Sequence, residues 1–199
     1  MTGRRALRLA AALVLLSAVP AAAWDEEQIF KKNTVILSFE GGYGKQFNLE
    51  GFNFQSDIEF FLGGVRAGIL PFGPTGSGAL HGAFEVGLEA IALRYTEPQG
   101  ATYAGLAIAT RYHFLWIDGF VPYVELGAAA GGTDLEVREI NSSFAFQLFG
   151  GLGAAVFLTD STALYGGYRY THISNGNTAR PNRGFEANTG VVGLSFFFH

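Results

Sequence analysis

Three residues near the C-terminal end of the chain have the types and spacing of an acyl-transfer site: His172, Ser174 and Glu186. A serine hydroxyl becomes a nucleophile when a neighbouring base takes its proton, and a carboxylate beside that base fixes its tautomer and stabilises the imidazolium. His172 and Ser174 are two residues apart, so on a β-strand they would share one face, with roughly 7 Å between their Cα atoms. A plainer interpretation is also open: the three groups are polar because they lie where two strands leave a membrane.

The segments that would position these residues alternate between apolar and polar or small residues with a period of two, which is typical of β-strands. In the segment 144–158, for example, the even-numbered residues are apolar or glycine throughout. The alternation is weakest where Glu59 and Arg66 have opposite parity, and there we expect a β-bulge at Gly63 and Gly64. The pattern predicts eight strands, at residues 34–44, 57–70, 80–95, 101–116, 120–131, 143–158, 162–174 and 186–198.

An even number of alternating strands, apolar outside and polar inside, indicates an outer-membrane β-barrel. An open sheet edge would leave backbone groups without partners in lipid, so the sheet must close, and eight strands leave an interior that side chains fill. We therefore expect an all-β, eight-stranded antiparallel transmembrane barrel with both termini in the periplasm. The alternative is a secreted soluble β-sandwich, in which a second sheet would have to cover these apolar stripes. Six charged residues should face inward and pair there: Glu40, Glu85, Glu89, Arg111, Glu125 and Arg169.

In the last two strands the even-numbered residues lie opposite the inward Arg169 and Ser195, so His172, Ser174 and Glu186 should project toward lipid. With periplasmic termini they would lie at the extracellular ends of neighbouring strands, where Glu186 is placed for a cross-strand contact with His172. An ionisable side chain that faces the membrane costs about 1–4 kcal/mol, depending on its depth. Such residues are by default candidates for a functional site.

The first 23 residues have the pattern of a secretory signal peptide. Arg4, Arg5 and Arg8 form a basic region, a short apolar stretch follows at 9–19, and three alanines at 21–23 fit a cleavage site. We expect cleavage before Trp24, which leaves a single domain at 24–199. An uncleaved anchor helix is the alternative. Loss of these residues lowers the Lys and Arg count from 13 to 10 against 17 acidic residues, so the mature charge is −7.

Composition excludes several classes of site. The chain contains no cysteine, which excludes disulfides, a cysteine nucleophile and cysteine-ligated zinc. A net charge of −4 argues against nucleic acid as a partner. The histidines outside the candidate site, His81, His113 and His199, lack the spacing of metal ligands. We expect neither a metal nor a cofactor.

The stretch His172-Ile-Ser174-Asn175, followed by Pro181-Asn182-x-Gly184-x-Glu186, resembles the closing signature of the outer-membrane lipid A 3-O-deacylase family. The resemblance is tight over the 15 residues from 172 to 186, and the rest of the chain is similar only as a barrel of the right length. It implies hydrolysis of the ester at the 3-position of lipid A, with release of a 3-hydroxy fatty acid and without a cofactor. It also implies that Ser174 is the nucleophile, His172 the base and Glu186 the orienting carboxylate. By the same resemblance, Asn175 and the backbone of Asn182 are candidates for the oxyanion hole.

The expected partner is lipid A, or lipopolysaccharide, in the outer leaflet of the outer membrane. Arg180 and Arg183 lie in the adjoining loop and could bind its phosphates, although solvated loop cations are an equal alternative. Two other functions stay open: a non-enzymatic structural barrel, and a barrel esterase that cleaves phospholipids. The latter class typically uses calcium at a dimer interface, and the lipid face here offers no cluster of carboxylates. A homodimer is compatible with the sequence.

Overall fold

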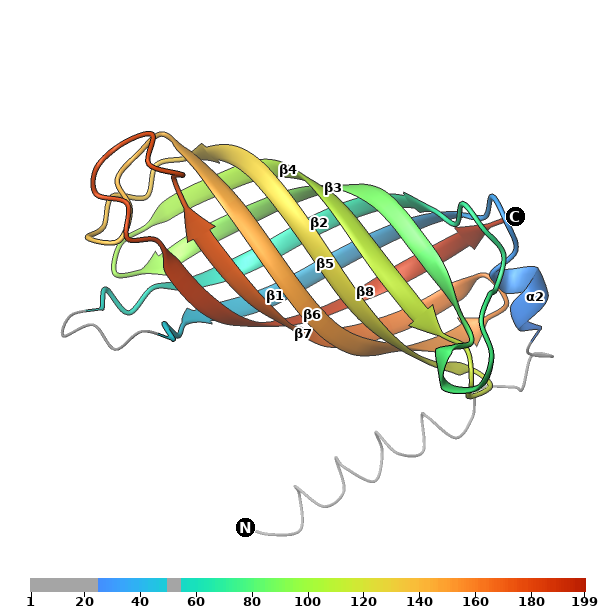
Figure 1. Ribbon diagram of the computed structural model, residues 1–199. Helices are drawn as coiled ribbons and strands as arrows, with labels where there is room; N and C mark the ends of the chain where they lie inside the picture. Colours follow the sequence, from blue (N-terminus) through green and yellow to red (C-terminus); the bar gives the residue numbers. More distant parts are fainter. Residues whose placement is uncertain (1–24, 50–54) are drawn as a thin grey trace, which may run out of the picture.

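The computed structural model describes residues 25–49 and 55–199, which form a closed antiparallel barrel of eight strands in sequence order (Figure 1). The predicted all-β, eight-stranded antiparallel barrel is therefore confirmed, and each strand end lies within two residues of its predicted position. The predicted signal peptide at 1–23 lies outside the described residues. The strands are β1 (Val35–Gln46), β2 (Glu59–Ile69), β3 (Gly82–Glu97), β4 (Ala101–Phe114), β5 (Phe120–Thr133), β6 (Phe144–Thr159), β7 (Thr162–Ser174) and β8 (Phe185–Phe198).

Strand pairing is regular along β2, and the predicted bulge at Gly63 and Gly64 is wrong. Gly63 pairs with Gly41 and Ala92, Gly64 pairs with Glu40 and Ile91, and the register continues unbroken on both sides. The irregularity lies instead between Glu59 and Phe60, at the end of the strand. Glu59 keeps the parity of the strand and faces outward, where its carboxylate accepts a hydrogen bond from Lys45 Nζ at 2.7 Å. An ion pair on the outer wall, rather than a bulge, explains the charge at this position.

The inward face carries the predicted charged residues, and they pair across the barrel. Arg169 is fully buried and its guanidinium bonds to Glu40 at 2.5 Å, Glu125 at 2.6 Å and Glu89 at 3.3 Å. Arg66, which was not on the predicted list, bonds to Glu89 at 2.6 Å and to Glu125 at 3.1 Å. Charged groups buried away from water are tolerated when they are paired in this way. The network joins strands that are not neighbours in the sheet.

The outward face is apolar over most of its height, as the alternation predicted. Four aliphatic side chains on three neighbouring strands are more than half exposed: Leu106 (57%) and Ile108 (63%) on β4, Leu126 (67%) on β5 and Leu152 (62%) on β6. Exposed aliphatic side chains over several neighbouring strands mark a surface that meets something other than water. The apolar band of an outer-membrane barrel has this character.

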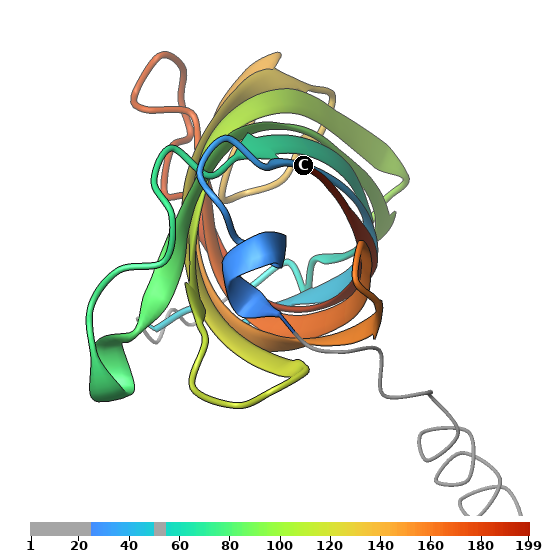
Figure 2. The ribbon, with the colours of Figure 1, turned by 90° about the vertical axis from the view of Figure 1, so that its right-hand side faces the viewer.

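One end of the barrel is closed by the segment that precedes β1. The short helix α2 (Glu26–Ile29) lies in the barrel mouth, at the same end as the C-terminus (Figure 2). Ile29 and Phe30 are buried, and Phe30 packs edge-on against Phe157 and Phe197. No helix in the described part of the chain is long and apolar enough to cross a membrane. The four loops that join β1–β2, β3–β4, β5–β6 and β7–β8 lie at the opposite end (Figure 1).

Candidate active site

The antiparallel pairing of β7 and β8 brings His172 and Glu186 together. The two residues are direct cross-strand partners, at the loop end of the hairpin. His172 Nδ1 lies 2.9 Å from Glu186 Oε1, within hydrogen-bond distance. The two side chains are 37% and 24% exposed on the outer wall, where their even parity was predicted to place them. The carboxylate therefore holds Nδ1, and Nε2 is the imidazole atom left to exchange a proton with a substrate or a hydroxyl.

Ser174 is the last residue of β7 and the next outward-facing position after His172. Its relation to the histidine is best seen from Gly184, the residue before β8. A Cβ built on Gly184 would lie 3.0 Å from His172 Cε1 and 3.2 Å from Ser174 Cβ, so both side chains border the same small space. Within residues 25–49 and 55–199, no hydrogen bond joins the Ser174 hydroxyl to His172. Bonds of this kind in unliganded sites often tighten only when substrate binds.

Gly184 is required at this position for two reasons. Its φ of 67° lies in the left-handed region that side chains disfavour, and its missing Cβ leaves the space that His172 and Ser174 border. The family motif includes Gly184, but the sequence did not show why a glycine is needed there.

Asn175 shapes the loop that follows β7. Its side chain is buried, and both hydrogens of the amide are donated inside the loop, to the carbonyl oxygens of Ala179 and Pro181, each at 3.1 Å. Its Oδ1 accepts from the backbone N–H of Asn177 at 3.0 Å. The side chain therefore has no donor left for an oxyanion in this conformation. Its backbone N–H is also used, because it donates to Asn182 Oδ1 at 2.8 Å.

Asn182 offers a backbone donor. Its side chain is engaged with the turn, since Oδ1 accepts from Asn175 and Nδ2 donates to Asn177 Oδ1 at 3.1 Å. Its backbone N–H donates to no other group in the part of the chain that the structure describes. Arg180 and Arg183 lie on the same loop, both exposed, within a few residues of the His172–Glu186 pair.

Two contacts from the β1–β2 loop reach Glu186, and nothing in the sequence pointed to them. Asn48 Oδ1 accepts from the Glu186 backbone N–H at 3.1 Å, and the Phe47 N–H donates to the Glu186 carbonyl at 2.9 Å. Residues 138 positions earlier in the chain thus fix the backbone that carries the carboxylate.

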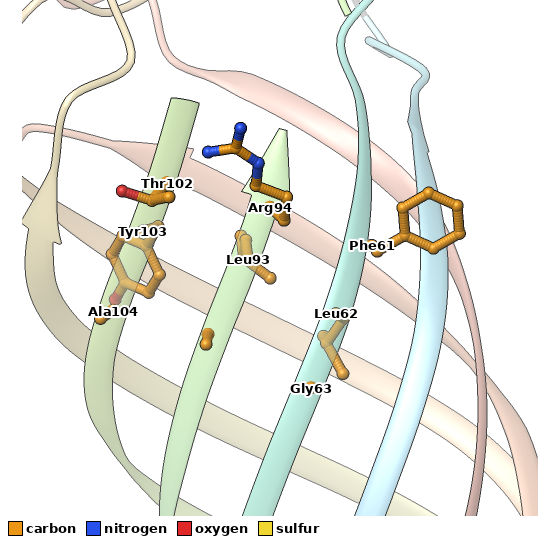
Figure 3. Close-up of a pocket in the computed structure, with 9 residues that line it drawn as sticks. Phe61, Leu62, Gly63, Leu93, Arg94, Thr102, Tyr103 and Ala104 are labelled. Atoms are coloured by element: carbon orange, nitrogen blue, oxygen red, sulfur yellow. The ribbon is translucent and has the colours of Figure 1, made fainter. Parts of the chain in front are cut away.

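The outer wall also carries a shallow hollow on the far side of the barrel from this hairpin. It measures about 440 Å³, lies over β2, β3 and β4 and is lined mainly by apolar and small side chains, with Arg94 and Thr102 at its upper rim (Figure 3). In the closed strand order β3 lies opposite β7, so this hollow is separate from His172 and Glu186. Among the described residues, no three histidine, aspartate or glutamate side chains gather as a metal site would require.

Comparison with known proteins agrees with the family resemblance and with the fold. A family described as lipid A 3-O-deacylase (PagL) matches residues 72–195. No curated protein matches the chain. The solved structure of the outer membrane enzyme PagL is 16% identical and covers 79% of this chain and 97% of its own, with a TM-score of 0.57. Neisserial surface protein A is 14% identical, covers 84% of this chain and 100% of its own, and has a TM-score of 0.58. The outer membrane protein OprG from Pseudomonas aeruginosa is 14% identical over 86% of this chain and 99% of its own, with a TM-score of 0.52. At these identities the solved structures show the shared barrel fold.

Proposed function

Because the chain belongs to the lipid A 3-O-deacylase (PagL) family, an outer-membrane barrel enzyme class, we propose that Ser174, His172 and Glu186 form the triad that hydrolyses the 3-O ester of lipid A. The observation that carries the proposal is the 2.9 Å contact between His172 Nδ1 and Glu186 Oε1 on the outward face. Barrel shape alone would not identify the activity, since Neisserial surface protein A resembles this chain as closely as the enzyme PagL does. The family match favours the enzyme over both alternatives raised by the sequence.

In the proposed reaction, His172 Nε2 takes the Ser174 Oγ proton while Glu186 stabilises the imidazolium. The serine oxygen attacks the ester carbonyl and forms a tetrahedral intermediate. As the intermediate collapses, its bond to the 3-oxygen of lipid A breaks, and His172 returns the proton to that oxygen. Water then gives a proton to His172, attacks the acyl-serine and releases the 3-hydroxy fatty acid. The serine hydroxyl is restored, so one water is consumed for each ester cleaved.

The negative charge of the tetrahedral intermediate needs hydrogen-bond donors that are already in place. We assign this part to the backbone N–H of Asn182, which donates to no group among the described residues and which the family motif includes. Asn175 was predicted as a second donor. Since both hydrogens of its amide are used within the loop, its part in the proposal is to maintain the turn that presents Asn182.

The outward position of the triad suits a substrate that diffuses within the membrane. A lipid beside β7 and β8 would bring its acyl ester to the barrel wall without entering the interior, which charged side chains fill. We place the four-loop end outside the cell and both termini in the periplasm, because lipopolysaccharide occupies the outer leaflet. In that orientation Arg180 and Arg183, which are exposed on the loop beside the triad, would bind the phosphates of lipid A. The chain would reach the membrane after removal of residues 1–23.

The test is mass spectrometry of lipid A from cells that express the wild-type chain or Ser174→Ala. We expect the wild type to remove one 3-hydroxyacyl chain and the variant to remove none, while both barrels show the same heat-dependent gel mobility. Ser143→Ala is the matched control, because Ser143 is an exposed serine in the β5–β6 loop. Unchanged lipid A with a folded wild-type barrel, in cells and again with purified substrate in detergent, would refute the function. Full activity of Ser174→Ala would refute the nucleophile.

A further inference from the structure

A buried polar cluster lies among the loops beside the triad. It consists of Gln46 at the end of β1, Asn48 and Ser56 in the β1–β2 loop, and Glu139 in the β5–β6 loop, and we refer to these four residues as the loop clamp. The Glu139 carboxylate is its centre. Oε1 accepts from the Ser56 backbone N–H at 2.9 Å and from Gln46 Nε2 at 3.0 Å, and Oε2 accepts from Ser56 Oγ at 2.6 Å.

The environment of Glu139 is unusual for a loop carboxylate. The residue is fully buried, with no exposed surface. A buried carboxylate is unfavourable unless hydrogen bonds compensate for the lost water, and here the three donors come from the end of β1 and from the β1–β2 loop, more than 80 residues away. An arrangement of this kind fixes one loop against another, because separating them would leave the carboxylate without these partners.

The main chain of Glu139 is hydrogen-bonded to the segment that borders the active site. Its carbonyl oxygen accepts from the backbone N–H groups of Arg183 at 2.9 Å and Gly184 at 3.0 Å. Gly184 in turn borders His172 and Ser174, where a Cβ would lie 3.0 Å from the histidine Cε1 and 3.2 Å from the serine Cβ. Glu139 is therefore one hydrogen bond from the glycine whose missing Cβ leaves the space that the two proton-exchanging side chains border.

The same clamp reaches the third member of the triad from the other side. Gln46 Nε2, which donates to Glu139, also lies 3.4 Å from Asn48 Oδ1. That oxygen accepts from the Glu186 backbone N–H at 3.1 Å. The segment before β8 and the residue that carries the carboxylate thus both connect to this cluster.

We propose that Glu139 is a positioning residue for the deacylation reaction: its carboxylate fixes the β1–β2 loop to the β5–β6 loop, so that its own carbonyl fixes Gly184 against His172 and Ser174. Glu139 does not touch the reacting atoms. The inference rests on the proposed triad and adds the residue that sets its geometry. Small displacements of reacting groups have large kinetic effects, on the order of 100-fold for about 1 Å.

Three variants give a graded test. Glu139→Ala removes both carboxylate oxygens that accept from Gln46 and Ser56, and we expect kcat to fall by about 10- to 100-fold with little change in KM. Glu139→Gln keeps the shape and one acceptor oxygen, so a smaller loss, of roughly three- to tenfold, is expected. Ser56→Ala removes only the hydroxyl that donates to Glu139 Oε2 at 2.6 Å, so its kcat should fall by a similarly small factor. Glu136→Gln is the matched control, because Glu136 lies three residues away in the same loop with an exposed side chain.

A role limited to folding would lower the amount of assembled barrel, whereas a positioning role changes the chemistry of the assembled one. The rate at which a fluorophosphonate probe labels Ser174 reports the Ser174–His172 geometry without lipid A. We expect labelling in the purified, detergent-folded variants to slow in parallel with kcat, at an unchanged midpoint of barrel unfolding in urea. Wild-type kcat and labelling in Glu139→Ala would overturn the inference.

The outcomes separate this inference from the proposed function. A wild-type chain that labels at Ser174 but leaves lipid A intact would refute the substrate, while the labelling rates of the variants would still decide the role of Glu139. A wild-type chain that neither labels nor deacylates would overturn both. Should Glu139→Ala fail to assemble, full labelling in both Glu139→Gln and Ser56→Ala would overturn the positioning role.

Discussion

Replacement of Glu186 tests the part of the proposed triad that the structure defines best. The carboxylate lies 2.9 Å from His172 Nδ1, and its backbone is fixed by Asn48 and Phe47. Glu186→Ala removes the acceptor, so the imidazole loses both its orientation and the stabilisation of its charged form. Glu186→Gln keeps the shape of the side chain but can present an amide N–H to His172 Nδ1. Nδ1 must then accept a hydrogen bond, so the imidazole proton moves to Nε2. In that tautomer Nε2 cannot take the serine proton.

The size of the effect follows from the exposure of the pair. A hydrogen bond to a charged group contributes about 1.5–3 kcal/mol, and each 1.36 kcal/mol is tenfold in rate. His172 and Glu186 are 37% and 24% exposed, so water competes for both groups and the upper limit is not expected. We therefore expect Glu186→Ala to lower kcat by roughly 10- to 100-fold. Glu186→Gln should be more severe, toward the roughly 10⁴-fold loss that the wrong tautomer causes in serine triads.

The assay is the initial rate of 3-hydroxy fatty acid release from purified lipid A in detergent, with barrel folding checked by gel mobility. Glu59→Gln is the matched control, since Glu59 also faces outward near the loop end but pairs with Lys45. A kcat within threefold of wild type in either folded Glu186 variant would refute the assignment. A Glu186→Gln variant more active than Glu186→Ala would refute the tautomer argument while leaving the carboxylate in the site.

The remaining predictions concern the barrel interior, the glycine beside the triad and the pH dependence of the loops. Arg169→Met leaves the Glu40 carboxylate without a cation and removes one cationic partner each from Glu89 and Glu125, which keep Arg66. It should lower the free energy of unfolding by about 3–5 kcal/mol in urea titrations; a loss below about 1 kcal/mol would contradict the importance of the network. Gly184→Ala should reduce kcat at least about tenfold through its clash with His172, whereas Gly119→Ala, with a similar positive φ of 71° and open space at the Cβ, should retain full activity. Burial raises the pKa of Glu139, but the hydrogen bonds from Ser56 and Gln46 lower it by more. Its pKa in the folded loops therefore lies below the ordinary value. Its contribution to loop docking is then complete above the ordinary glutamate pKa and is lost as pH falls through the lower, folded-state pKa. The protection factor of the Gly184 amide against hydrogen exchange should fall in the wild type as pH drops below the ordinary glutamate pKa of about 4.3, and a Glu139→Gln variant with the same fall would contradict this origin.

The sequence alone was sufficient for the barrel and for the identity of the triad candidates. Alternation with period two is a local property of each strand, so it fixed which residues face lipid and placed Arg169 inside and His172 outside. The residues from 172 to 186 lie in a single hairpin, and the antiparallel partnership of His172 and Glu186 follows from the pairing of consecutive strands. Where parity was misread, at Glu59, the cause was an ion pair on the outer wall that local alternation cannot show.

Only the tertiary structure revealed what orders the site. Gln46, Asn48, Ser56 and Glu139 come from the end of β1 and from two loops, and the contact between Gln46 and Glu139 spans 93 residues. Loops have no periodicity, and a hydrogen bond between two of them depends on how closure of the barrel brings their ends together. The same holds for Asn175, whose amide looked available for catalysis in the sequence but is used by carbonyl groups of its own turn. Strand pattern determines which side of the wall a residue faces, whereas the partners of a buried polar group are determined by the packing of the closed chain.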